Sequence, residues 1–407
     1  MRILKFISAF VGTALVLGVV VIGLNWTAFN TFLENREAFM EGSDWVPKTE
    51  SLRGLTEYIE QNPQNVSVAS IVLEHPDSTI FYEADTPRTM GALSNIFLMT
   101  AYAIEMESGD LNPEELISVN DIDKYVLPQI DNSVHADAIT FAEEKGWVQN
   151  GEISVQDAFV LLSHFNDPAL SDYLWWKLEP FDWDGLMDQF GLESTDTPLP
   201  FSGIYLTISE SVSNQFIDEL ISDWDERSKS EFRDYVIQQS NEFTTDSTIR
   251  EELTKEFEDD RLGRSFMEER DAMELFPKAT ARDLTTFLEQ IYTQENISSR
   301  ASERILNWLR SPYSDRSEIQ RDFTDYGALF DNRMGLLNGV DFGTLVYTGE
   351  TKFQAIIFDN LPIGFWFHMS GNHMHQDFQQ RLIYDPALID LMEQVSLSDN
   401  QERSEIN

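Results

Sequence analysis

The feature that most constrains this chain is an apolar run near its beginning, FISAFVGTALVLGVVVIGL at residues 6–24, which contains no ionisable side chain. At about 1.5 Å rise per residue, a helix of this length spans a hydrocarbon core of roughly 30 Å. Arg2 and Lys5 precede the run and no small-x-small cleavage site follows it, which favours an uncleaved signal-anchor over a cleaved signal peptide. The positive end stays in the cytoplasm, so the sequence predicts a cytoplasmic tip at residues 1–5, a transmembrane anchor at residues 6–25 and a periplasmic or extracellular remainder.

The rest of the chain is very acidic. Asp and Glu number 71 against 28 Lys and Arg, which gives a formal net charge of −43. Such an excess is typical of a halophilic protein, because high salt screens most of the self-repulsion. The charge excludes nucleic acid and anionic lipid as partners, since both are polyanions. Cysteine is absent, so neither disulfides nor thiol chemistry is available, and nothing in the sequence predicts a cofactor.

The first half of the chain combines helices with a hairpin. Residues 27–63 are predicted to form a membrane-proximal helical stalk. The run VSVASIVLEH, a turn at residues 75–78 and the run TIFYEA predict a β-hairpin. An apolar helix is expected to end at Gly109, and a second apolar helical region, residues 154–178, is expected to break at Pro168.

The second half returns from helix to strand. Residues 209–277 are highly charged with a helical pattern, and we interpret them as an acidic surface insertion. A helix begins near Ala279, and the three runs LLNGVDFGTLVYTG, TKFQAIIFDNL and IGFWFHMSG predict strands. A helix from Asp385 and a polar tail at residues 398–407 follow. This order predicts an α+β domain at residues 64–397, with an antiparallel sheet built from both ends of the chain and flanked by a helical region.

The same order resembles that of the class A β-lactamases and penicillin-binding serine hydrolases. A hairpin precedes GALSNIF at residues 91–97, which opens an apolar helix ending in ESGDL. VQDAFVLLSHFNDPALSDYL resembles the helix that carries the family's Ser-Asp-Asn, and NRMG at residues 332–335 lies where the family has Lys-Thr-Gly. The resemblance covers residues 64–397 without the insertion, and it implies a β-lactamase/transpeptidase-like fold.

The nucleophile motif is altered. The family's acyl transfer uses a Ser whose proton is removed with help from a Lys one helical turn later. Ser94 is present, but the Lys position holds Phe97, which cannot accept a proton. Class A enzymes also use a loop glutamate to activate the deacylating water, and Glu193 is the one candidate in the loop GLESTDTPLPFSGIYL. A second interpretation of Ser94 is a helix N-cap.

The other two motifs are altered as well. FND at residues 165–167 replaces Ser-Asp-Asn, so the hydroxyl is gone and only Asn166 and Asp167 remain as candidates. In the third motif Arg333 keeps the cation and Gly335 keeps the glycine. The resemblance implies that Arg333 would hold a substrate carboxylate, and a surface ion pair is the alternative. Because general acid–base groups contribute on the order of 10²–10⁴-fold each, these losses predict a degenerate site.

Histidines offer weaker candidates. His373 and His375 form an H-x-H that could bind a metal, but no third ligand lies at a suitable spacing, so no metal site is predicted. His164 lies near the candidate motif at residues 165–167 and could serve as a base for Ser94, although a surface histidine is the simpler interpretation.

Three functions follow from these patterns. The first is a membrane-anchored, catalytically degenerate pseudoenzyme that binds a carboxylate-bearing or peptidoglycan-like ligand near Arg333 or acts structurally at the cell envelope. The second is an active serine hydrolase that uses Ser94 with a rearranged base. The third is a membrane-tethered scaffold whose acidic insertion at residues 209–277 recruits a protein partner.

Overall fold

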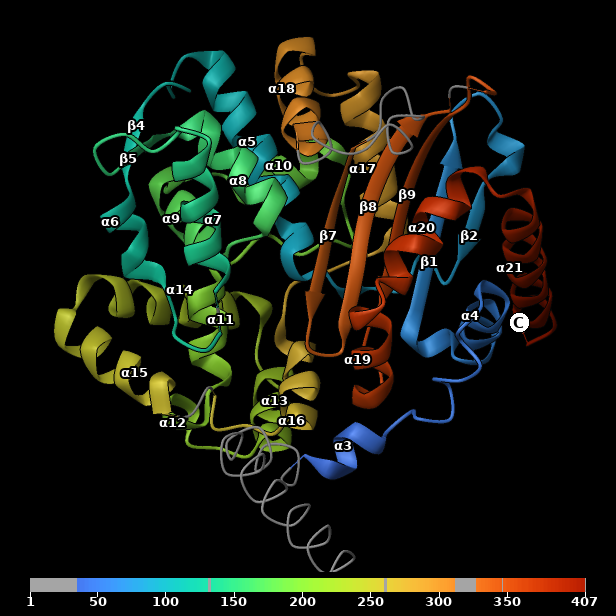
Figure 1. The fold of residues 1–407 in the computed structure, drawn as a ribbon, viewed down its shortest axis with the longest axis horizontal. Helices are drawn as coiled ribbons and strands as arrows, with labels where there is room; N and C mark the ends of the chain where they lie inside the picture. The colour runs from blue at the N-terminus through green and yellow to red at the C-terminus, as the bar shows by residue number, and fades with distance from the viewer. Residues whose placement is uncertain (1–34, 131–132, 260–261, 312–326, 346, 407) are drawn as a thin grey trace, which may run out of the picture.

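The frame of the domain is an antiparallel sheet of five strands in the order β2-β1-β9-β8-β7 (Figure 1). β1 lies between β2 and β9, pairing Val68 with Tyr82 on one side and with Ile356 on the other. The sheet is therefore built from both ends of the chain, as predicted. The strands are β1 (Val66–Val72), β2 (Ile80–Tyr82), β7 (Gly327–Arg333), β8 (Leu336–Thr344) and β9 (Thr351–Phe358).

The computed structural model describes most of the chain after the predicted anchor. The described residues are 35–406 apart from 131–132, 260–261, 312–326 and 346. The cytoplasmic tip and transmembrane anchor predicted at residues 1–25 lie outside them. Within the described part, no helix is both long enough and apolar enough to cross a membrane.

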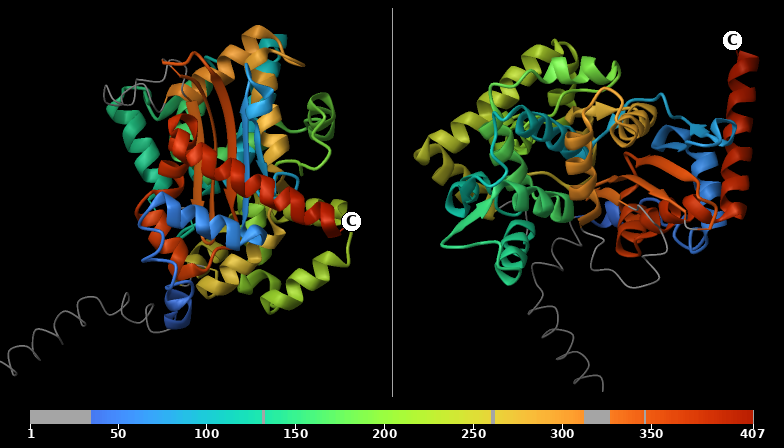
Figure 2. Two further views of the ribbon diagram at one scale, coloured as in Figure 1. Left: turned by 90° about the vertical axis from the view of Figure 1, so that its right-hand side faces the viewer. Right: turned by 90° about the horizontal axis from the view of Figure 1, so that it is seen from above.

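Alternate residues of the central strand β9 point to opposite faces of the sheet, as the two-residue period of a strand requires. Ile356 and Phe358 belong to one buried apolar cluster, while Ala355 and Ile357 belong to another. Every residue of β9 is buried. The domain therefore has two cores, one on each face of the sheet, and helices cover both faces (Figure 2).

The first core lies under helices from both ends of the chain. These helices are α4 (Leu52–Gln61), α19 (Ile363–Gly371), α20 (Met374–Tyr384) and α21 (Pro386–Ile406). α4 belongs to the predicted stalk, yet Leu55, Tyr58 and Ile59 are completely buried against the sheet. This part of the predicted stalk is thus integral to the domain. The predicted polar tail continues α21 as far as Ile406.

The prediction of a strand for IGFWFHMSG is wrong, because these residues form α19. Pro362 precedes the helix, and the buried residues Ile363, Trp366 and Met369 recur at the three-residue spacing of one helix face. Aromatic, β-favouring composition hid this spacing in the sequence. The strand that was missed instead is β7, the edge strand beside the candidate site.

The second core lies under α5 (Asn95–Ser108), α17 (Ala281–Thr293) and α18 (Ser299–Arg310). α5 ends at Gly109, which has a φ of 88° and closes the helix in the left-handed conformation, as predicted. Beside it, the apolar region of residues 154–178 is divided into α8 (Val155–Phe165) and α9 (Pro168–Leu178), so the break predicted at Pro168 is confirmed.

The charged segment of residues 209–277 is helical, as predicted, but it is not only a surface feature. α14 (Lys229–Thr245) lies along α11 (Phe201–Ile208) so closely that a side chain at Gly203 would collide with the Val236 carbonyl. Val236 and Phe243 are completely buried in the second core. The segment is therefore integrated into the domain, which disfavours the detachable recruitment arm.

The remaining elements of the described chain are short or peripheral. They are the helices α3 (Arg36–Met40), α6 (Val119–Ile122), α7 (Val134–Glu144), α10 (Trp183–Phe190), α12 (Glu210–Ser213), α13 (Ile217–Asp225), α15 (Ser247–Asp259) and α16 (Phe266–Ala272), and the strand pairs β3 (Arg88–Thr89) with β6 (Lys278–Ala279) and β4 (Leu116–Ser118) with β5 (Glu152–Ser154).

Candidate ligand-binding cleft

A cleft of about 350 Å³ opens between the helical region and the edge strand β7. Its lining comes from widely separated elements and includes His164, Asn166, Tyr205, Glu269, Arg333 and Trp366. Of the residues predicted from the sequence, Asn166 and Arg333 are thus brought together. Ser94, Asp167 and Gly335 are not among the lining residues, and each has a different role.

Ser94 ends the short 3₁₀ turn Gly91–Ser94 that leads into α5. Its Oγ donates a hydrogen bond to the Gly91 carbonyl at 2.9 Å, and the residue is only 5% exposed. Ser94 occupies the N-cap position of α5, as the second interpretation held, but its side chain makes no capping hydrogen bond to the helix. One turn later, Phe97 is completely buried and packs on Phe287 with ring centroids 4.9 Å apart. The position that needs a base is therefore part of the core.

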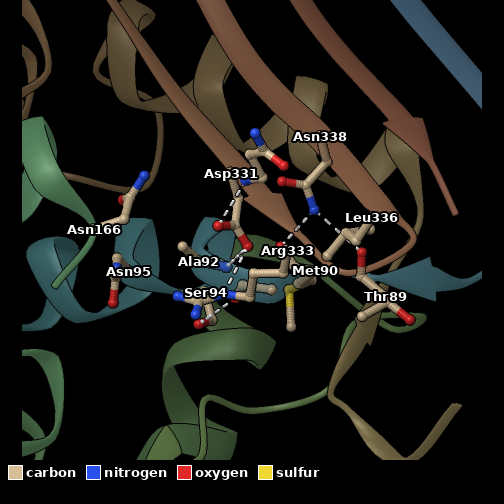
Figure 3. Close-up of polar contacts among 12 residues, drawn as sticks. Thr89, Met90, Ala92, Ser94, Asn95, Asn166, Asp331, Arg333, Leu336 and Asn338 are labelled. Atoms are coloured by element: carbon tan, nitrogen blue, oxygen red, sulfur yellow. Dashed lines mark hydrogen bonds and ion pairs between the residues drawn. The ribbon is translucent and has the colours of Figure 1, made fainter. Parts of the chain in front are cut away.

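The carboxylate of Asp331 lies at the 3₁₀ turn that leads into α5. Its Oδ2 accepts the Ala92 N–H at 2.7 Å and the Arg333 Nε–H at 3.0 Å (Figure 3). A carboxylate at a helix N-terminus satisfies an otherwise unpaired donor and interacts favourably with the helix dipole. Gly91 has a φ of 53° and would press a side chain against the same carboxylate oxygen, so the close approach requires glycine here.

Arg333 is ion-paired, as the alternative interpretation of this residue held. Besides its bond to Asp331, its Nη1 donates to the Tyr205 hydroxyl at 3.0 Å, and its guanidinium lies 4.7 Å from the centre of the Phe201 ring. The side chain is 13% exposed. Arg333 therefore links the end of β7 to α11 across the cleft, and a ligand carboxylate would have to compete with Asp331 for it.

Gly335 lies in a turn and does not line the cleft. Arg333 pairs with Leu336 in the β7–β8 hairpin, so Met334 and Gly335 form its two-residue connection. Gly335 has a φ of 70°, which favours glycine, and its carbonyl accepts the Leu361 N–H at 3.0 Å. The NRMG stretch therefore ends the edge strand.

The α8–α9 junction holds the other candidate pair. Asn166 adopts the left-handed conformation that ends α8, and its Nδ2 donates to the Phe330 carbonyl of β7. Its Oδ1 is buried and has no hydrogen-bond partner among the described residues. Asp167 points away from the cleft: it is completely buried and caps α9 by accepting the Ala169 N–H at 3.0 Å. Asn166 is thus a cleft residue and Asp167 is a structural one.

His135, which the sequence analysis did not single out, is the partner of Asp167. Its Nδ1 lies 2.7 Å from Asp167 Oδ2, and its Nε2 lies 3.0 Å from Asp123 Oδ1. Burial alone would lower the pKa of His135, but hydrogen bonds and charges from Asp167 and then Asp123 outweigh it and raise this pKa from 6.5 to about 9. The imidazolium therefore fixes α7 to the start of α9 at neutral pH.

The weaker candidates are either exposed or have no companion ligands among the described residues. His164 is exposed and packs against Phe141 and Phe165, with ring centroids 5.0 and 4.5 Å away. Glu193 is exposed after α10 and does not line the cleft. His375 is 4% exposed and burial lowers its pKa to about 4, whereas His373 is exposed. The described residues contain no group of three metal-binding side chains.

Comparison with known proteins gives only structural matches. No family model matches the chain, and no curated protein matches it. A β-lactamase from Sphaerobacter thermophilus is 12% identical with a TM-score of 0.45, covering 84% of this chain and 95% of that one. A β-lactamase from Chitinophaga pinensis is 11% identical with a TM-score of 0.45, covering 79% of this chain and 99% of that one. The protein PBP-A is 12% identical with a TM-score of 0.43, covering 86% and 96%.

These similar structures are of the class that the order of motifs in the sequence resembles. At this level of identity and TM-score the similarity carries nothing about ligand or activity. The α+β architecture of this chain rests on its own strand order, and the chemistry of its cleft rests on its own side chains.

Proposed function

We propose that this chain is a membrane-anchored, extracytoplasmic β-lactamase-like protein that binds a ligand in its cleft without acyl transfer. The observation that carries the proposal is the hydrogen bonding of Ser94. Its hydroxyl donates to the Gly91 carbonyl, and the residue one turn later is the buried Phe97. A serine is a poor nucleophile unless a base removes its proton, and this geometry provides none at Ser94 among the described residues.

The polar lining of the cleft supports retained binding. Asn166 presents a buried carbonyl oxygen without a partner in the described part of the chain, and an unsatisfied buried acceptor is unfavourable by about 1–3 kcal/mol unless a ligand or water pairs with it. Arg333, which also lines the cleft, is held by Asp331 and Tyr205. We propose a peptide or cell-wall fragment as the ligand, with an amide N–H facing Asn166 and a carboxylate that competes with Asp331 for Arg333.

Intact-mass spectrometry after incubation with a reactive penicillin tests the loss of acyl transfer. The full chain is treated in high salt beside Ser94→Ala, with circular dichroism confirming that both are folded. We expect no adduct on either protein. An adduct on the unaltered chain that the alanine variant lacks would show that Ser94 is an activated nucleophile and would establish the active-hydrolase alternative.

Binding is tested separately by calorimetry with a carboxylate-bearing peptidoglycan peptide. We expect weak binding to the unaltered chain and tighter binding to Asp331→Asn, because that substitution removes the carboxylate that competes for Arg333. The matched control Arg333→Gln should lose binding. Equal affinity of all three proteins would show that the carboxylate does not reach Arg333.

A further inference from the structure

Large apolar side chains are exposed on the face of the domain where the described chain begins. Met40 is 63% exposed at the end of α3, Phe216 is 72% exposed at the start of α13, and Phe367 is 37% exposed on α19. We propose that this face, defined by these three residues, docks onto the lipid surface of the membrane that holds the predicted anchor. The inference rests on the anchoring that is part of the proposed function.

The three residues belong to one face. Phe266 at the start of α16 contacts both Phe39 and Phe367, with ring centroids 5.7 and 5.8 Å away. Two residues earlier, Arg264 holds the Gln215 carbonyl at 2.8 Å, which places the neighbouring Phe216 beside the start of α16. α3, α13, α16 and α19 gather at the same end of the molecule in Figure 1.

The starting point of the described chain is fixed rigidly on this face. Glu41 after α3 accepts hydrogen bonds from Arg270 of α16 at 2.6 Å and from the Ile363 N–H of α19 at 2.9 Å. Asn35 accepts the Phe266 N–H at 3.2 Å. Because α3 is attached to two other helices, the chain leaves the domain at a defined place.

The link to the anchor is short. About ten residues lie between the end of the predicted anchor at Asn25 and the start of the described chain at Asn35, and ten residues span at most roughly 35 Å when fully extended. A domain of this size has a radius of gyration of roughly 21 Å, so its width exceeds the link. The face that carries Asn35 must therefore be near the membrane, with Met40 a few residues farther on.

The charges on this face select the kind of lipid. Exposed acidic side chains lie near two of the apolar ones, Glu37 near Met40 and Asp218 and Glu219 near Phe216, and the exposed Arg36 also lies on α3. Anionic headgroups would repel them, whereas zwitterionic headgroups would not. Exposed Phe and Met then bury apolar area at the boundary between headgroups and acyl chains, as interfacial segments do. The partner is therefore a zwitterionic bilayer surface.

The absence of cysteine makes this surface directly measurable. Single-cysteine variants of the full chain, Met40→Cys and Phe216→Cys, are labelled with an environment-sensitive fluorophore and reconstituted into phosphatidylcholine vesicles in high salt. A quencher attached to the upper acyl chain reports contact with lipid. Leu116→Cys is the matched control, because Leu116 is 58% exposed on β4, far from α3 in Figure 1. Leu15→Cys reports the anchor itself.

We expect the labels at positions 15, 40 and 216 to lose most of their emission to the lipid quencher, and the label at position 116 to keep it. Quenching at position 15 without quenching at 40 and 216 would overturn the docking while leaving the anchor intact. Absence of quenching at position 15 would overturn the anchor and the docking together. Protection of positions 40 and 216 that grows with protein concentration and not with quencher lipid would show a second copy on this face and would also overturn the proposal.

Discussion

Two buried carboxylates, Asp331 at the cleft and Asp167 behind it, each accept a backbone N–H at the start of a helix and each pair with a cation, but the two cations differ. Asp331 accepts the Ala92 N–H in the 3₁₀ turn before α5 and pairs with Arg333, while Asp167 caps α9 and pairs with His135. Each carboxylate therefore satisfies a helix N-terminus and neutralises one cation.

The difference lies in the cation. The guanidinium of Arg333 stays charged at any pH a protein survives, so the cation of the link at the cleft does not lose its charge at alkaline pH. The imidazolium of His135 has a pKa of about 9 and loses its charge above it. The link behind the cleft is therefore weakened at alkaline pH. The wall that faces a ligand is thus held by a permanent charge pair, and the helices that support it are held by a titratable one.

The largest expected effect is the loss of Asp167. Asp167→Ala leaves the buried His135 with only the half-exposed Asp123 and removes the α9 cap, and breaking such a buried pair destabilises by about 3–5 kcal/mol. Urea denaturation in high salt measures this change. The control Asp123→Ala removes the exposed partner and should lose less than about 1 kcal/mol. Similar losses in the two variants would contradict the central role of Asp167.

Alkaline pH should weaken the same link without a mutation. The folded-state pKa of His135 is raised to about 9, above its ordinary value of 6.5. Its contribution to stability is therefore fully present below pH 6.5 and is lost as the pH rises through 9. The two pKa values imply up to about 3 kcal/mol over that window. Denaturation midpoints against pH should fall for the unaltered chain and stay flatter for His135→Gln. A parallel fall in both proteins would assign the effect to another group.

The link at the cleft should respond to removal of the Asp331 charge and not to a change of pH between 6.5 and 9. Asp331→Ala leaves Arg333 without its carboxylate and the Ala92 N–H without an acceptor, which we expect to lower the free energy of unfolding by about 2–3 kcal/mol. Asp331→Asn keeps an acceptor oxygen and should lose about half as much. If the pH profile of Asp331→Ala differed from that of the unaltered chain between pH 6.5 and 9, the two links would not be independent.

The smallest effect is expected at Ser94. Ser94→Ala removes one hydrogen bond, to the Gly91 carbonyl, and should change the unfolding free energy by about 1 kcal/mol or less. Calorimetric binding of the cleft ligand should be unchanged, because Ser94 does not line the cleft. A large loss of affinity would show that the Ser94 hydroxyl contacts the ligand, and it would contradict the assignment of Ser94 to a purely structural role.

The sequence predicted the parts of the fold that local patterns determine. The strand runs of β1 and β9 and the breaks at Gly109 and Pro168 depend on neighbouring residues, and they are where the sequence places them. The prediction for the residues of α19 was wrong, because their aromatic composition favours a strand while the spacing of their buried residues is that of a helix.

The site was less predictable because its partners are far apart in the chain. The residues near Ala92 do not predict its contact with Asp331, which lies 239 positions later in the chain. The residues near Asp167 do not predict its contact with His135, which lies 32 positions earlier. The sequence could show that Phe97 cannot be a base. It could not show which carboxylates accept the unpaired N–H groups at the starts of the helices, because those contacts form only when the sheet and helices are assembled.

The position of β1 in the centre of the sheet also determines when the domain can fold. β1 leaves the ribosome early, but its neighbour β9 comes almost last, and the helices over their shared core, α19 to α21, come later still. Closing such a long loop is slow, because chain entropy is lost before the native contacts form. If the domain is exported as proposed, β1 crosses the membrane before β9 does. The edge of β1 that pairs with β9 therefore stays unpaired until the C-terminal segment has been exported.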